Sequence, residues 1–107
     1  MRPATCAGVD TGDLIDAVRA RRVVELHYRG RGARVVHPHA VYRTASGALR
    51  LDGLQVGGAT RSGSLPGWRD FDLMRITDVR VLEAGFEPAD DFNPAAERYG
   101  RGLLASV

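Results

Sequence analysis

The sequence predicts a mostly β protein, namely a small antiparallel β-barrel of about five strands preceded by one α-helix. Near the N-terminus, apolar residues recur at helical spacing. The period then changes to two, in short runs separated by glycine-containing turns. A β-sandwich needs about seven strands, and the helices that would alternate with the strands of a parallel sheet are missing from the pattern. A strongly bent antiparallel sheet therefore fits best.

The composition indicates one globular domain. The chain has 107 residues, of which 44% are hydrophobic and 26% charged. No apolar run approaches the roughly 20 residues that span a membrane, and the first ten residues lack the apolar core of a signal peptide. The lone Cys6 supports neither a disulfide framework nor a metal cluster. We therefore expect a cytoplasmic protein without a cofactor, in which residues 1–9 form a flexible tail.

The helix is expected to run from Asp10 or Thr11, either of which can cap it, to about Arg22. Alternation then predicts a strand at 24–28 and a second at 33–42. Pro38 lies inside the second strand, so this strand is expected to lie at a sheet edge or to contain a bulge.

Three more strands are expected further along the chain. The first covers residues 49–56 and is expected to kink or bulge at Gly53. The glycine-rich stretch 57–67 reads as a hairpin loop, because it has no phosphate-loop spacing. Residues 68–76 then form the strand that we take as central, and residues 79–82 a short last strand. Beyond it, 84–107 is expected to be an extended segment packed on the barrel, because its aromatic residues alternate with prolines.

All 15 basic residues are arginine, and they are unevenly distributed. Residues 1–50 carry a net charge of +5 and residues 51–107 a net charge of −3. Arginine suits phosphate and carboxylate because its planar fork binds both in a bidentate manner. Arg69 is in phase with Phe71 and Leu73 on the apolar face of the strand 68–76, where an unpaired charge is costly. Such an arginine reaches the rim or meets an anion, which points to binding rather than to chemistry.

The order of these landmarks resembles the WYL domain of bacterial transcription regulators, over residues 12–82. Three runs carry the resemblance, in this order: Leu14-Ile15-x-Ala17-Val18 leading to Val24-x-Leu26-x-Tyr28, then Arg34-Val35-Val36-His37-Pro38, and then Arg69-x-Phe71-x-Leu73-x-Arg75-Ile76. At the position of the family's Trp-Tyr-Leu this chain has Leu49-Arg50-Leu51, so only the leucine is kept. We accordingly treat residues 10–83 as a WYL-like domain.

The resemblance implies an Sm/SH3-like barrel that senses a negatively charged ligand, including single-stranded nucleic acid. By position it implies ligand contacts at Tyr28, Arg34, Arg69 and Arg75, with Arg50 as a substituted position.

Each of these positions also has a purely structural interpretation. The arginines at 69 and 75 can pair with nearby carboxylates, Arg50 can be a surface residue, and Tyr28 can pack in the core with its hydroxyl at the rim. Trp68 can offer a stacking surface to a base, or it can cover the loop or the C-terminal segment.

A metal site and an enzymatic site both lack part of what they need. His37 and His39 share a strand face without a cysteine, which makes an incomplete metal site. No serine or cysteine lies in a nucleophile motif beside a base. Two hypotheses remain. The first is a non-enzymatic module that binds single-stranded nucleic acid or a nucleotide-like anion. The second is a protein-interaction module that docks a partner regulator or a second copy of the chain.

Overall fold

The structure is a computed structural model that describes residues 11–30, 32–59, 64–100 and 102–107. The tail predicted at 1–9, Cys6 and the centre of the loop predicted at 57–67 lie outside these residues. One α-helix and two 3₁₀ turns are present: α1 (Thr11–Ala20), η1 (Leu73–Arg75) and η2 (Glu97–Tyr99). There are six strands: β1 (Arg22–Tyr28), β2 (Ala33–Arg43), β3 (Leu49–Gly58), β4 (Gly67–Asp72), β5 (Ile76–Gly85) and β6 (Leu103–Ser106).

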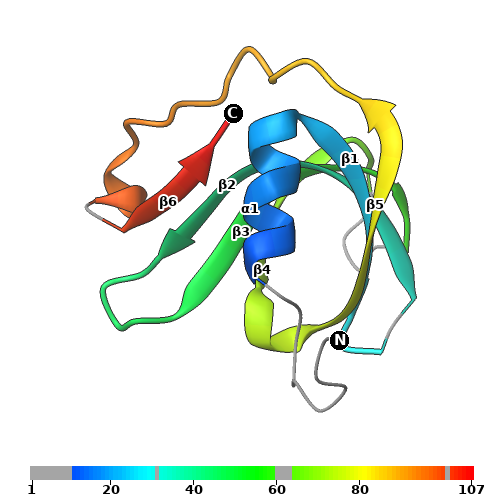
Figure 1. The fold of residues 1–107 in the computed structure, drawn as a ribbon, viewed down its shortest axis with the longest axis horizontal. Coiled ribbons are helices and arrows are strands. Elements are labelled where there is room, and N and C mark those ends of the chain that lie inside the picture. The colour runs from blue at the N-terminus through cyan, green and yellow to red at the C-terminus, as the bar shows by residue number, and fades with distance from the viewer. Residues whose placement is uncertain (1–10, 31, 60–63, 101) are drawn as a thin grey trace.

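The strands form one antiparallel sheet in the order β4-β3-β2-β1-β5, and β6 pairs with β2 (Figure 1). The mostly β class with one preceding helix is therefore confirmed, with six strands rather than about five. The predicted closed barrel is not seen, because the described residues show no pairing between β4 and β5, and the sheet stays open there. β5 pairs along β1 instead, so β4 and β5 form the two edges of the sheet.

The main core lies between α1 and one face of the bent sheet. The helix buries Leu14, Ala17 and Val18, which recur at the spacing of one helical face. The sheet meets them with fully or almost fully buried side chains, among them Leu51 and Phe71. Asp13 in the first turn and Arg19 in the last suit the helix dipole.

The stretch 68–76 differs from its prediction in two ways. It is not one strand, because β4 ends at Asp72, whose Oδ1 accepts the backbone N–H of Met74 at 3.0 Å and caps η1. It is also not central, because β4 lies at an edge of the sheet. Phe71 and Leu73 are both buried as the alternation predicted, although Leu73 reaches the core from the 3₁₀ turn.

Pro38 lies inside the sheet at a bulge, and the edge-strand alternative is wrong. In β2 and β3, Pro38 pairs with Gly53 and Ala40 with Asp52, so His39 is the extra residue. The bulge that was expected at Gly53 in β3 thus lies at His39 in the facing strand β2. Gly53 allows the close approach, because a Cβ there would lie 2.5 Å from Cγ1 of Val36.

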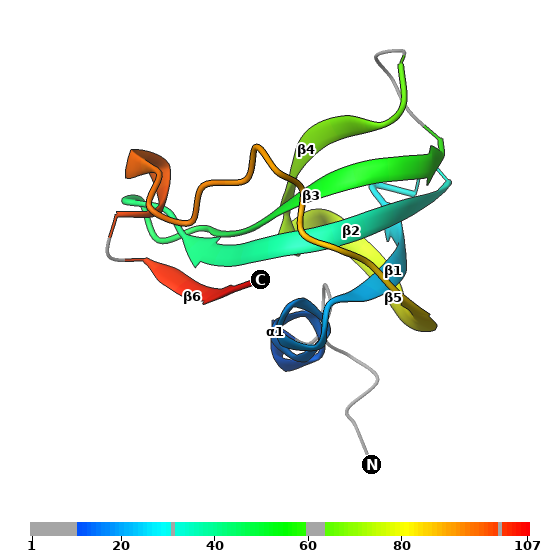
Figure 2. The same ribbon diagram turned by 90° about the horizontal axis from the view of Figure 1, so that it is seen from above.

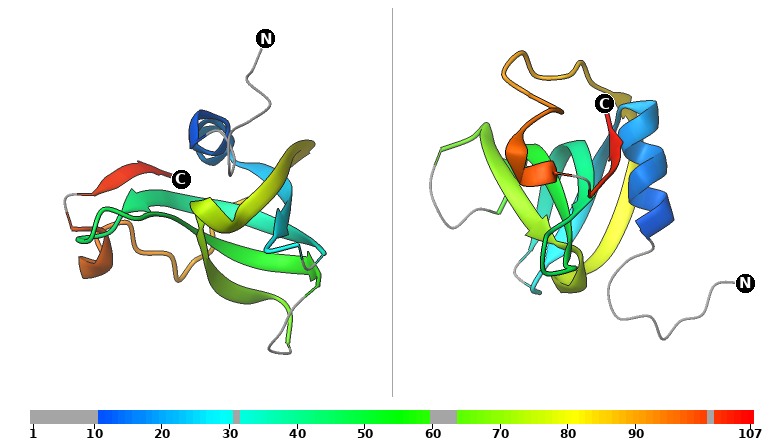
Figure 3. Two further views of the ribbon diagram at one scale, coloured as in Figure 1. Left: turned by 90° about the horizontal axis from the view of Figure 1, so that it is seen from below. Right: turned by 90° about the vertical axis from the view of Figure 1, so that its left-hand side faces the viewer.

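The segment between β5 and β6 lies on the face of the sheet opposite α1. Figure 2 and the left-hand view of Figure 3 show α1 on one side of β2 and the segment that leads to η2 on the other. There Tyr99 is 2% exposed and forms a second cluster with Ala40 and Tyr42. Within the described ranges, no helix has both the length and the apolar character to cross a membrane.

Candidate ligand-binding site

Three arginines gather around Tyr28 at the end of β1. The guanidinium carbons of Arg34 and Arg29 lie 5.4 Å and 5.5 Å from the centroid of the Tyr28 ring, within cation–π distance. The backbone N–H of Arg29 donates to the carbonyl of Arg75 at 2.9 Å, which brings the backbone of a third arginine beside the first. We call these four residues the Tyr28 arginine group.

Tyr28 is held from two sides. Its hydroxyl accepts the backbone N–H of Asp72 at 3.0 Å, and its ring meets Phe71 edge-on at 5.1 Å. The tyrosine therefore joins the core to the arginine group, as its structural interpretation anticipated.

The arginines of the group differ in exposure. Arg29 is exposed and half of the Arg75 side chain is exposed, whereas Arg34 is only 7% exposed. Nε of Arg75 lies 3.8 Å from Oδ2 of Asp72, an ion pair on the surface that contributes little. The exposed guanidinium groups of Arg29 and Arg75 can attract an anion to this place.

The structure brings Tyr28, Arg34 and Arg75 together, but it places Arg50 and Arg69 elsewhere. Nη1 of Arg50 pairs with Oδ2 of Asp70 at 3.2 Å, and Nη1 of Arg69 donates to the carbonyl of Trp68 at 2.9 Å. These two arginines belong to β3 and β4, at the other end of the strand order from β1 and β5. The five positions implied by the resemblance thus divide between two places.

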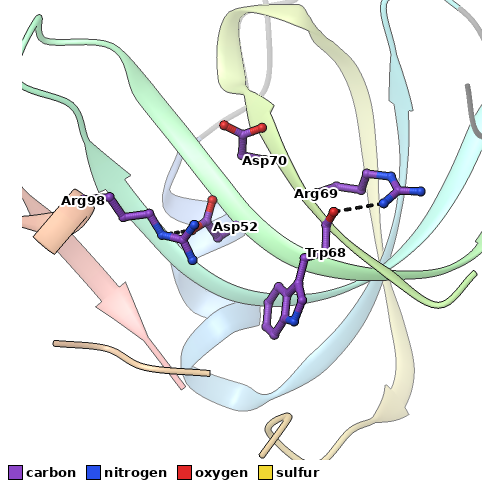
Figure 4. A pocket seen from close by; sticks show the side chains of 5 residues that line it. All are labelled: Asp52, Trp68, Arg69, Asp70 and Arg98. Atoms are coloured by element: carbon purple, nitrogen blue, oxygen red, sulfur yellow. Dashed lines mark hydrogen bonds and ion pairs between the residues drawn. The ribbon is translucent and has the colours of Figure 1, made fainter. Parts of the chain in front are cut away.

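A second place, a cavity of about 430 Å³, opens on the outer face of β3 and β4. Its lining residues are Asp52, Trp68, Arg69, Asp70 and Arg98. Figure 4 shows Trp68 and Arg98 on either side of Asp52, while the side chain of Arg69 points away from them. We call this cavity the Trp68 pocket.

Asp52 lies buried at the bottom of the Trp68 pocket. Its side chain is 3% exposed and accepts hydrogen bonds from the hydroxyls of Tyr99 at 2.8 Å and Tyr42 at 3.3 Å. Nε of Arg98 lies 3.1 Å from the same carboxylate. Burial raises the pKa of the Asp52 carboxyl, and the hydrogen bond from Tyr99 and the charge of Arg98 oppose this shift. Burial also raises the pKa values of both tyrosines to about 12.

His37 and His39 are used for packing. The His37 ring stacks on Phe86 with 4.8 Å between centroids, and the fully buried His39 ring meets Trp68 edge-on at the same separation. Nδ1 of His39 faces the carbonyl of His37 at 2.8 Å, so this nitrogen carries the proton. In the part of the chain that the structure describes, no three His, Cys, Asp or Glu side chains gather in a way that would hold a metal.

Sequence reasoning did not single out Arg29, Asp52 or Arg98. Arg29 follows the last residue of β1 and has a φ of 55°, a left-handed turn conformation that aims its side chain back over the strand end. The neighbouring Gly30-x-Gly32 turn is the only signal that could have marked it. Asp52 alternates with buried Leu51, a pattern that predicts solvent, but Tyr42 and the later residues Arg98 and Tyr99 cover it.

No protein-family model and no curated protein matches the sequence. The fold is similar to part of a solved structure, that of proteasome accessory factor B/C (PafBC) of Arthrobacter aurescens, with a TM-score of 0.66 and 27% sequence identity. The similarity covers 91% of this chain but only 15% of PafBC, so the chain spans a small part of that protein's length. The likeness supports a WYL-like fold for this chain.

Proposed function

We propose that this chain is a non-enzymatic, ligand-sensing domain of a bacterial regulatory system in the cytoplasm. Its ligand is a negatively charged molecule, such as single-stranded nucleic acid or a nucleotide. The likeness to PafBC and the resemblance to WYL domains both fit a regulatory role.

The observation that carries the proposal is the Tyr28 arginine group. Arg29 and Arg75 offer exposed guanidinium groups to phosphate oxygens, and Arg34 adds its charge from a position against the Tyr28 ring. Tyr28 is fixed by its hydrogen bond with Asp72, so the arginines are arranged around a rigid centre.

The test is fluorescence anisotropy of a labelled strand of about 20 nucleotides, measured over a series of salt concentrations. Binding should weaken steeply with salt. The slope of the logarithm of the binding constant against the logarithm of the salt concentration is negative, and it should become shallower by about 0.7 for each phosphate contact removed. Arg75→Ala should lower both the affinity and the slope. Arg80→Ala, which removes an arginine that is 69% exposed and paired with Glu25 on the other side of β1, is the matched control and should change neither.

A second candidate function, a protein-interaction module, has one observation in its favour. The sheet is open, so β4 and β5 each offer a strand edge that another chain could extend. This function predicts association that hardly responds to salt. The protein-interaction function is favoured over anion sensing if the protein does not bind single-stranded nucleic acid at low salt and if its self-association in sedimentation experiments does not respond to salt.

A further inference from the structure

The Trp68 pocket contains a pair of neighbouring carboxylates. Asp52 and Asp70 are directly opposite each other in the β3–β4 pairing, where like charges destabilise a sheet. Arg98 pairs with the first and Arg50 with the second. These arginines offset the repulsion, and they leave a polar surface of both signs at the bottom of a cavity.

The wall of the pocket is a preorganised aromatic surface. Nε1 of Trp68 donates to Oδ2 of Asp91 at 2.9 Å, and its ring is supported by His39 edge-on and by Phe92 with 6.2 Å between centroids. An indole that is already fixed loses little freedom when a flat ligand stacks on it. The volume of about 430 Å³ lies within the range of small-ligand sites.

The polar groups of the pocket offer both acceptors and donors. Arg50 contacts only Oδ2 of Asp70, and 58% of the Asp70 side chain is exposed, so this carboxylate can accept further hydrogen bonds. Arg98 uses Nε for Asp52, and 60% of its side chain is exposed, so an acceptor can reach its guanidinium group. Asp52 and Asp70 are each paired with an arginine, Arg98 and Arg50, so these four side chains have no net formal charge, which favours a neutral ligand over a free phosphate.

We propose that the Trp68 pocket binds a guanine base, stacked on Trp68. Guanine is flat and neutral, and it presents both kinds of polar group. Its N1–H and exocyclic amine would donate to Asp70, and its O6 and N7 would accept from Arg98. This inference rests on the proposed recognition of nucleic acid or nucleotides and adds a base preference to it. Trp68 of the pocket and Asp72, which is hydrogen-bonded to Tyr28, are four residues apart on β4, or about 13 Å along a β-strand. One single-stranded nucleic acid can therefore reach both the Trp68 pocket and the Tyr28 arginine group.

The test uses Trp68 itself, because it is the only tryptophan in the sequence. Guanosine, which has no phosphate, should quench and shift the tryptophan emission in a saturable manner. Inosine, which lacks the exocyclic amine, and adenosine, which lacks O6, should bind about tenfold more weakly. Asp70→Asn should weaken guanosine by a similar factor. Asp78→Asn, an exposed aspartate on β5, should leave it unchanged.

The possible results separate this inference from the proposed function. If Arg75→Ala leaves guanosine binding intact but weakens binding of the single-stranded nucleic acid, the result supports both the guanine pocket and the proposed function. No saturable response to guanosine, or equal responses to guanosine, inosine and adenosine, overturns the guanine pocket even if salt-sensitive strand binding persists. If the protein binds guanosine but no single-stranded nucleic acid, the result supports the guanine pocket and overturns single-stranded nucleic acid as the ligand of the proposed function. Circular dichroism of each variant verifies that it is folded.

Discussion

Nε2 of His39 accepts the backbone N–H of Ala89 at 3.0 Å, which ties the bulge of β2 to the segment that follows β5. Because Nδ1 of the same ring donates to the His37 carbonyl, both ring nitrogens are occupied only when the imidazole is neutral. A proton on Nε2 would face the Ala89 N–H and remove this bond.

Acid should therefore destabilise the protein. Burial lowers the pKa of His39 below its usual value of 6.5, against opposing effects of the His37 carbonyl and Asp91. Burial also lowers the pKa of His37, and the neighbouring His39 adds to the shift. Below pH 6.5 the unfolded chain binds protons that the folded chain resists, so stability falls by up to about 1.4 kcal/mol per pH unit for each histidine.

Urea unfolding between pH 8 and pH 5 checks this prediction. His39→Phe keeps an aromatic ring but removes the titrating group, so its stability should depend less on pH than that of the wild type. A wild type with constant stability down to pH 5 would contradict the prediction.

Alkali should destabilise the protein through a different pair of residues. The pKa values of Tyr42 and Tyr99 are raised to about 12, chiefly by burial and with a further contribution from Asp52. The unfolded chain therefore loses these protons first as the pH passes the usual tyrosine value of 10.0, and stability falls from there towards pH 12. Tyrosinate absorbance and unfolding curves should change together, and Tyr99→Phe should flatten the stability curve.

Asp52→Ala should destabilise the protein by about 2 kcal/mol, because it leaves two buried tyrosine hydroxyls without their acceptor. Asp70→Ala, at the position facing it across the strands, removes a carboxylate that is more than half exposed, and should change stability by less than about 0.5 kcal/mol. Thermal or urea unfolding of the two variants gives the comparison. Equal effects would mean that the tyrosine bonds to Asp52 contribute nothing.

Gly53→Ala should cost about 1–3 kcal/mol, because its new Cβ would overlap Cγ1 of Val36 and press on the His37 carbonyl. Gly57→Ala in the same strand is the matched control, since its Cβ would lie 3.5 Å from the nearest atom, an ordinary contact. Denaturant midpoints of the two variants test this difference. A stable Gly53→Ala protein would show that the bulge at His39 can shift to make room.

The sequence predicted the elements whose pattern depends on local periodicity. The helix and the strands β1 to β3 follow from spacing alone, although the helix ends at Ala20 rather than at about Arg22, which is already the first residue of β1. β6 was not separated from the extended segment, because four residues give too short a run to show alternation. The split of 68–76 was not visible either, because buried Leu73 continues the alternation while Asp72 ends the strand by capping η1.

The arrangement of the site was harder to predict than its composition. Tyr28, Arg34 and Arg75 were chosen from the sequence and lie near one another, but the sequence did not separate them from Arg50 and Arg69. That division depends on where the open sheet ends and on which face the later residues cover. These are contacts between residues far apart in the chain, and periodicity carries no information about them.

One edge of β2 is shared by two strands that are made at very different times. Residues 33–36 pair with β1, and residues 40–42 pair with β6. On the ribosome, the second half of this edge emerges about sixty residues before its partner, a wait of about 3 to 12 seconds at bacterial rates of synthesis. An uncovered strand edge is a template for aggregation. Pro38, which has no N–H to offer, lies where that uncovered stretch begins, so the nascent chain carries its own protection until β6 is made.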